Sequence, residues 1–163
     1  MHPVAVINAG PLVALSLAGQ LDLLPILFHR ILIPGAVYQE VAIDGLGRAG
    51  AAMLTDTMWR SRVVDAPEPD PLLIAELDRG EAEVIALANA SQPCLAVIDE
   101  KRGRRIASQV YGLSVKGTAG IMVEAYRRGH IQDLRGILEG MKHDGYFLAN
   151  AVIEAACRAA DSA

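Results

Sequence analysis

The chain has 163 residues, a net charge of −4, 52% hydrophobic residues and only 4% aromatic residues. This length suits one domain, residues 1–163, with one core that must be mostly aliphatic. The acidic balance excludes tight non-specific binding of nucleic acid by the whole surface, although it leaves room for a local basic patch. The most apolar region carries Gln20, Asp22 and Pro25, so it does not predict a membrane span.

The two cysteines, Cys94 and Cys157, lie in apolar surroundings and lack metal-ligand spacing. Reduced core thiols are the simpler interpretation, and they favour a cytoplasmic protein. The N-terminal sequence MHPVAVI lacks the basic start and the cleavage site of a signal peptide. We therefore expect a cytoplasmic location.

Short apolar runs alternate with stretches of helical spacing along the chain. Strands are expected at residues 4–7, 30–34, 61–66, 95–98 and 113–117. Helices are expected at 11–19, 21–28, 35–43, 48–59, 71–78, 100–112, 118–130, 131–141 and 146–160, together with one that begins near residue 80. This alternation predicts an α/β domain with a central parallel sheet of about five strands.

The helix before the fourth strand carries the most informative pattern. Val84, Ile85 and Ala88 recur at the spacing of one helix face. Glu81 opens the same stripe one turn earlier, whereas Glu83 points elsewhere. The strand that follows is continuously apolar, which predicts burial on both faces, as in a parallel sheet.

Four polar side chains are expected at the carboxyl edge of this sheet. They are Asn8, Glu40, Glu81 and Asp99. A right-handed β-α-β layout brings helix starts and strand ends to the same edge, where open α/β sheets bind ligands. Clustered carboxylates repel one another unless a cation lies between them, so the cluster predicts Mg²⁺ or Mn²⁺, which favour oxygen ligands. Such an ion can activate water and stabilise a phosphoryl transition state.

Each of the four residues also has a purely structural explanation. Asn8 and Asp99 can cap the helices that follow them. Glu81 can form a capping box with Asp78, and Glu40 can be a solvated helix residue. Their joint placement on one edge is what favours a site.

A basic group follows Asp99 directly and consists of Lys101, Arg102, Arg104 and Arg105. Beside an acidic metal site, these side chains can hold a phosphate backbone. The alternative is an ordinary solvated helix face, since basic residues are usually exposed. No aromatic residues are interleaved, so base stacking is not indicated.

The segment 45–50 satisfies the GxGxxG pattern of dinucleotide-binding proteins. That pattern is informative only directly after a strand of a β-α-β unit. Here Gln39 and Glu40 lie in the preceding segment, which suits a doubly buried strand poorly. Dinucleotide binding is therefore the weaker alternative, and the simpler interpretation is a flexible loop.

The chain resembles the PIN-domain superfamily and, within it, a VapC-like branch of bacterial and archaeal proteins. The matching stretches are VINAGPLVALSLAGQLDLL, ILIPGAVYQEV, RGEAEVIALA, LAVIDEKRGRRIA, GLSVKGTAGIMVEAYRRG and GYFLANAVIEAACRAA. The resemblance implies a three-layer α/β/α sandwich and a ribonuclease that depends on Mg²⁺ or Mn²⁺. It also implies RNA as a partner, a cognate antitoxin, and a dimer in many members.

The family's acidic positions fall on Asn8, Glu40, Glu81 and Asp99, and Thr118 falls where a small hydroxyl residue often borders the site. Lys101 and Arg102, together with Thr118, are the candidates for substrate contact. The departure is Asn8, where most of the family has Asp. An amide oxygen can ligate a metal but adds no charge, so the alternative function is a catalytically weakened module that binds nucleic acid or an antitoxin.

Overall fold

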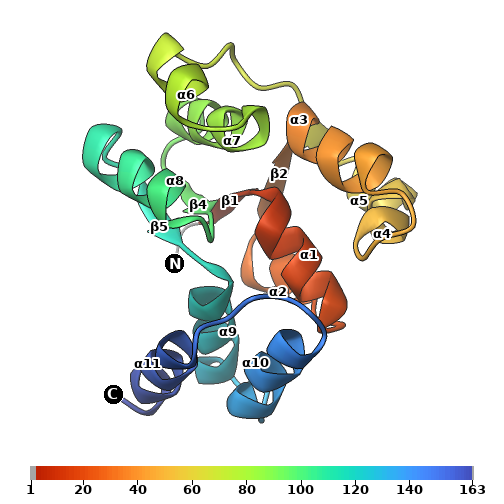
Figure 1. The fold of residues 1–163 in the computed structure, drawn as a ribbon, viewed down its shortest axis with the longest axis vertical. Coiled ribbons are helices and arrows are strands. Elements are labelled where there is room, and N and C mark those ends of the chain that lie inside the picture. Colours follow the sequence, from red (N-terminus) through yellow and green to blue (C-terminus); the bar gives the residue numbers. More distant parts are fainter. Residues whose placement is uncertain (1–2, 163) are drawn as a thin grey trace.

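The computed structural model describes residues 3–162, in which a five-stranded parallel sheet lies between layers of helices (Figure 1). The strands are β1 (Val4–Ile7), β2 (Arg30–Pro34), β3 (Val63–Val64), β4 (Leu95–Val97) and β5 (Ser114–Lys116). Their order is β3-β2-β1-β4-β5, and every neighbouring pair is parallel. The predicted α/β/α fold class is confirmed.

The order of the strands reverses at β1. The chain moves from β1 to β2 and β3 on one side, and then returns to place β4 on the other side of β1. In open α/β sheets, ligands bind at the carboxyl ends of the strands beside such a reversal. Asn8 directly follows β1, and Asp99 lies two residues beyond β4. The two predicted site residues therefore flank the reversal point.

The helices form a layer on each side of the sheet (Figure 1). One layer contains α6 (Pro71–Glu76), α7 (Arg79–Ala90) and α8 (Lys101–Arg105), which continues as the π-helical segment Ile106–Val110. The other contains α1 (Ala9–Leu17), α2 (Leu23–Leu27), α9 (Thr118–Arg127), α10 (Leu134–His143) and α11 (Asn150–Asp161). Beside β2 and β3 lie α3 (Gly35–Tyr38), the π-helical segment Gln39–Asp44, α4 (Ala51–Thr55) and α5 (Thr57–Arg60). Within residues 3–162, none of the helices is both long and apolar enough to cross a bilayer.

The core is aliphatic, as the composition predicts. All of β4 is buried, in agreement with its uninterrupted apolar sequence. Ile85 on α7 and Ile7 on β1 are fully buried, and each side chain of this size contributes about 1.5–3 kcal/mol through burial. Cys94 is buried and Cys157 is half-buried, and both are free thiols.

Two local predictions need correction, and the doubt about the 45–50 fingerprint is confirmed. The helix expected at 48–59 is broken at Asp56, whose carboxylate accepts a hydrogen bond from the amide of Met58 and so starts a new helix. The third strand is only two residues long. The fingerprint at 45–50 follows the helical segment Gln39–Asp44 rather than a strand, so it lacks the structural context that dinucleotide binding requires.

Candidate functional site

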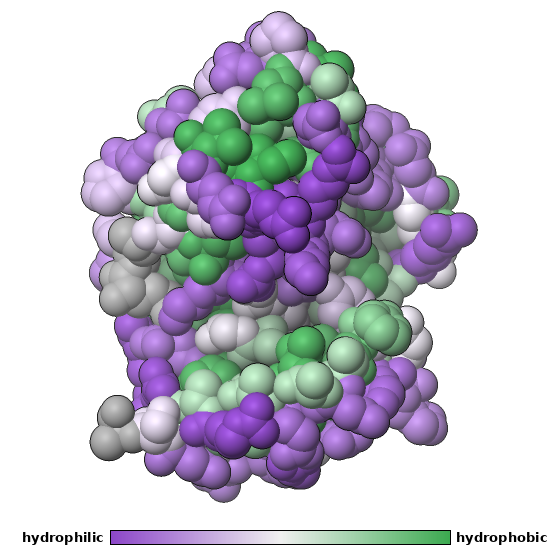
Figure 2. Space-filling model, turned by 60° about the vertical axis from the view of Figure 1, so that its left-hand side comes forward, coloured by the Kyte–Doolittle hydropathy of each residue, from purple (hydrophilic) through white to green (hydrophobic). Residues whose placement is uncertain are grey.

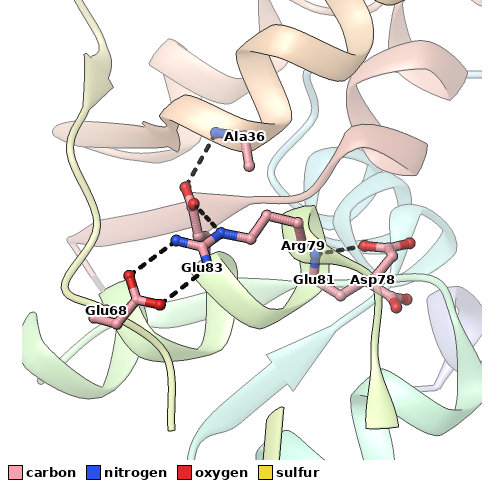
Figure 3. A network of polar contacts seen from close by, with 6 residues as sticks. All are labelled: Ala36, Glu68, Asp78, Arg79, Glu81 and Glu83. Carbon is pink, nitrogen blue, oxygen red and sulfur yellow. Dashed lines mark hydrogen bonds and ion pairs between the residues drawn. The ribbon is translucent and has the colours of Figure 1, made fainter. Parts of the chain in front are cut away.

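The buried carboxylate of Glu81 lies at the start of α7. Asp78 occupies the N-cap, and its Oδ1 accepts a hydrogen bond of 2.8 Å from the Glu81 amide (Figure 3). The backbone N–H of Asp78 in turn contacts the Glu81 carboxylate and lowers its pKa, which is the reciprocal contact of a capping box. Glu81 is only 7% exposed, and Val84 and Ile85 on the same stripe are fully buried. The predicted helix face is therefore correct, and the contacts with Asp78 agree with the capping box that the sequence allowed.

Glu83 points away from this carboxylate, as predicted, and joins two elements (Figure 3). Its Oε1 accepts a hydrogen bond of 3.0 Å from the amide of Ala36, at the start of α3. Its Oε2 pairs with Arg79 at 2.8 Å, and Arg79 also contacts both carboxylate oxygens of Glu68. This network holds α7 against the segment that carries Glu40.

Several negative charges surround Glu81. Burial raises the pKa of Glu81 to about 7, and the charges of Asp78 and Glu100 act in the same direction. Glu40 adds a smaller effect, and its own pKa is raised by burial and then by Asp78. These carboxylates lie around Gly80, where a Cβ would be in ordinary contact with Glu40 Oε2 at 3.4 Å and with Asp78 Oδ1 at 3.5 Å. The structure therefore brings Glu40 and Glu81 together with two further acids.

Asp99 has a different environment, because neutral donors surround it. Its Oδ1 accepts a hydrogen bond of 2.6 Å from the Thr118 amide, and its Oδ2 accepts one of 2.6 Å from the Thr118 hydroxyl. The hydroxyl of Tyr146 also donates to Oδ2. Gly117 is the N-cap of α9. Thr118 is the first helical residue, and its fully buried hydroxyl is directed to Asp99.

Asn8 follows β1, the central strand, which lies between β2 on the side of Glu40 and β4 on the side of Asp99. Asn8 is 5% exposed, and its backbone N–H donates a hydrogen bond of 3.0 Å to the carbonyl of Val97 in β4. It holds the N-cap position of α1, yet its side chain makes no capping hydrogen bond. The capping role that the sequence allowed is therefore not realised.

The basic residues after Asp99 separate into different surroundings. Lys101 is exposed and forms no ion pair within residues 3–162, whereas Arg102 pairs with Glu76. Arg104 approaches Asp99, since a Cβ at Gly117 would lie 2.6 Å from Arg104 Nη1 and 2.7 Å from Asp99 Oδ1. Arg104 Nη1 itself donates to the carbonyl of Ile98 at 3.4 Å, so a side chain at position 117 would require Arg104 or Asp99 to move.

A groove of about 710 Å³ extends from Asp99 along α9 and α11. Val123, Leu148 and Val152 contribute to its apolar wall, and Arg104 and Arg127 to its basic rim. Figure 2 shows an apolar band between hydrophilic surfaces in the lower half of the molecule. The candidate site therefore opens onto a long, largely apolar surface.

The donor set suits a hard divalent cation, because the four predicted residues offer only oxygen ligands at this edge. A cation beside Glu81 would also relieve the repulsion that raises its pKa. Among residues 3–162, however, no three acidic, histidine or cysteine side chains stand close enough together to hold one ion. The chemistry fits, and binding would require side-chain movement.

The family of the chain follows from a comparison of its sequence with family profiles. The profile of the PIN domain matches residues 4–162. The chain belongs to the PIN-domain family. Searches of curated proteins and of solved structures gave no match. PIN domains have a nuclease fold, generally use divalent metals and are associated with nucleic-acid binding.

Four further residues of this PIN domain lie in the candidate site, although the sequence analysis did not predict them there. Asp78 was visible in the sequence only as a cap, and Glu100 only as the neighbour of Asp99. Arg104 belonged to the basic group but not to the substrate candidates. Tyr146 has no local signal, because it reaches Asp99 across 47 positions of the chain.

The raised pKa of Glu81 predicts how stability depends on pH. A carboxyl whose folded pKa lies at about 7, above its ordinary 4.5, stabilises the fold at low pH. That stability is lost as pH rises through 7, by up to roughly 3 kcal/mol in the absence of metal. In EDTA, Glu81→Gln should therefore gain stability relative to the parent between pH 5 and about 8, measured by urea unfolding. Glu83→Gln should keep the parent's pH dependence, and equal slopes for the parent and Glu81→Gln would contradict this assignment.

Proposed function

We propose that this PIN domain is a metal-dependent endoribonuclease of the VapC-like toxin type, which cleaves RNA phosphodiesters. The observation that carries the proposal is the buried Glu81 carboxylate, whose pKa is raised to about 7 by burial and by the charges of Asp78, Glu100 and Glu40. Isolated buried charge is costly, so proteins pair it, neutralise it or use it to bind a cation. Its place beside the reversal point of the sheet favours the last of these roles.

Four residues would hold the ion, Mg²⁺ or Mn²⁺. Glu40, Glu81 and Asp99 supply carboxylates, directly or through water, and Asn8 supplies a neutral amide oxygen or positions water. When bound, the ion would supply activated water and charge stabilisation at the phosphate. Asp78 and Glu100 add negative potential around Glu81, which strengthens the attraction for a cation.

The substrate contacts proposed from the sequence are Lys101, Arg102 and Thr118. Lys101 is the best placed for a phosphate, because it is exposed and has no carboxylate partner among the described residues. Arg102 would first have to leave Glu76. Thr118 would act mainly through Asp99, which its hydroxyl and amide both contact.

The proposal extends to the partners and location of the toxin type. RNA is the substrate, a cognate antitoxin is the neutralising protein, and a homodimer is the assembly in a cytoplasmic setting. These statements are supported by the resemblance of the motifs around Asn8, Glu40, Glu81 and Asp99 to VapC-like proteins. A gene for a small antitoxin beside this one would support them further.

A binding module without catalysis is the second candidate function. It is favoured by the neutral side chain of Asn8 and by the hydrogen bonds that already occupy Asp99. Both features lower the affinity for a cation, because one removes a charge and the other occupies an acceptor. Such a module would bind RNA without cleaving it, with Mn²⁺ or with EDTA.

The first test is RNA cleavage by the purified protein in Mn²⁺ and in EDTA, with two variants of α7. Glu81→Gln should reduce Mn²⁺ affinity and cleavage on the order of 10-fold or more, because it removes a ligand carboxylate. Glu83→Gln is the matched control, since its carboxylate faces Ala36 and Arg79. Equal losses in both variants, by calorimetry and by cleavage, would reject the site. RNA binding without cleavage by the parent would favour the binding module.

The departure at position 8 generates a second test. Asn8→Asp should leave the fold intact, because the two residues have nearly the same size and both suit an N-cap. In EDTA at neutral pH the added charge should cost about 1–2 kcal/mol near the other acids, and Mn²⁺ should restore the stability. Tighter Mn²⁺ binding and faster RNA cleavage should follow. If Asn8→Asp has the same stability with and without Mn²⁺ and the same cleavage activity as the parent, Asn8 is not part of the site.

The two neighbouring basic residues provide a third test. Lys101→Ala should weaken RNA binding and reduce the slope of log affinity against log salt by nearly 1, because one phosphate contact is lost. Arg102→Ala should change the slope less, since Arg102 is paired with Glu76. Binding titrations at several salt concentrations measure both slopes, and an unchanged slope for Lys101→Ala would leave that residue an ordinary surface lysine.

A further inference from the structure

The segment 144–149 joins α10 to α11 and brings Tyr146 to the candidate site. Figure 1 shows it as the connection that passes between α10 and α11 on the side of the sheet that carries α1. Gly145 has a φ of +102°, a conformation that favours glycine, and this turn directs the following residue inward. The Tyr146 hydroxyl then donates to Asp99 Oδ2 and lies near Gly10 of α1, where a Cβ would be 3.5 Å away.

The hydrogen bonds on Asp99 leave little room for another partner. An ionised carboxylate offers about four lone-pair positions, two on each oxygen. Thr118 and Tyr146 hydroxyls occupy both positions of Oδ2, and the Thr118 amide occupies one position of Oδ1. A cation that coordinates Oδ2 must therefore displace a hydroxyl.

The two hydroxyls differ in how easily they can leave. Thr118 is fully buried in the first turn of α9, and its amide is fixed to the same carboxylate. Tyr146 lies in a connecting segment between exposed Gly145 and Phe147, which is 85% exposed. Connecting segments with exposed neighbours open at a lower free-energy cost than packed helices. Buried Leu148 anchors the end of the segment, but Tyr146 itself is only half-buried, so its hydroxyl is the more easily displaced of the two.

We propose that Tyr146 and a divalent cation compete for Oδ2 of Asp99, so that the segment 144–149 is an autoinhibitory latch on the metal site. The inference rests on the proposed function only in taking Asp99 as a metal ligand. With Tyr146 bound, Asp99 is held by neutral donors beside the groove. With Tyr146 released, Oδ2 regains a free lone pair and the groove changes shape, since Tyr146 is part of its lining.

The test is Mn²⁺ binding by calorimetry to the full chain and to Tyr146→Phe, which keeps the ring and removes the hydroxyl. The variant should bind Mn²⁺ about 10-fold more tightly, because the competing hydrogen bond to a charged group is lost. Tyr111→Phe is the matched control, since its hydroxyl donates to Asp70 at 2.8 Å elsewhere in the molecule. It should bind Mn²⁺ like the parent.

Tyrosine absorbance provides a second measurement that does not depend on activity. Mn²⁺ should change the tyrosine difference spectrum of the parent and of Tyr111→Phe, and this component should be absent in Tyr146→Phe. Mn²⁺ affinity that is equal or weaker in Tyr146→Phe, while the parent binds the ion, would overturn the latch and leave the metal site standing. Failure of both proteins to bind Mn²⁺ would overturn the metal site and the latch together. Binding by Tyr146→Phe alone would support the latch.

Discussion

A carboxylate buried on the apolar face of α7 is the constraint on which the candidate site depends. Glu81 lies on the stripe that packs α7 against the sheet, so it cannot turn to solvent without removing Val84 and Ile85 from the core. The helix tolerates it because Asp78 caps the backbone and leaves the Glu81 side chain at the edge of the sheet. The cost of burial appears as its raised pKa. A cation is the partner that would reverse this cost.

The elements around α7 are arranged to keep that carboxylate in place. Glu83 and Arg79, on the opposite side of the same helix start, tie α7 to α3 and to Glu68 (Figure 3). Gly103 lets α8 pack closely, because a Cβ there would lie 3.2 Å from Ile98 Cγ2 and 3.4 Å from Glu81 Oε1, whereas a Cβ at Gly80 would be in ordinary contact with Glu40. The site therefore depends on close backbone approach as well as on its charged side chains.

The two halves of the site have opposite electrostatic character. Glu81 is surrounded by like charges, which raise its pKa, whereas Asp99 is held by Thr118 and Tyr146 and lies near Arg104. The charged form of one carboxylate is disfavoured, and the other is already satisfied by hydrogen-bond donors. The oxygen ligands of the site suit a metal ion, yet no three acidic, histidine or cysteine side chains among residues 3–162 stand close enough to hold one. The hydrogen bonds that already hold Asp99 account for this, because they keep its carboxylate directed to Thr118 and Tyr146. Control of Asp99 would then decide whether the site can close around an ion.

The sequence alone determined that the sheet is parallel with about five strands, and it determined the face of α7, whereas the strand order came from the tertiary structure. Continuous apolar runs predicted doubly buried parallel strands, and the 3.6-residue spacing placed Glu81 inward and Glu83 elsewhere, because both patterns arise from local backbone geometry. Only the tertiary structure decided which groups satisfy Asp99, that Arg102 turns to Glu76, and that Asn8 does not cap its helix. These outcomes depend on side chains distant in the chain. Tyr146 meets Asp99 because α10 and α11 fold back over α9, and no local periodicity encodes that approach.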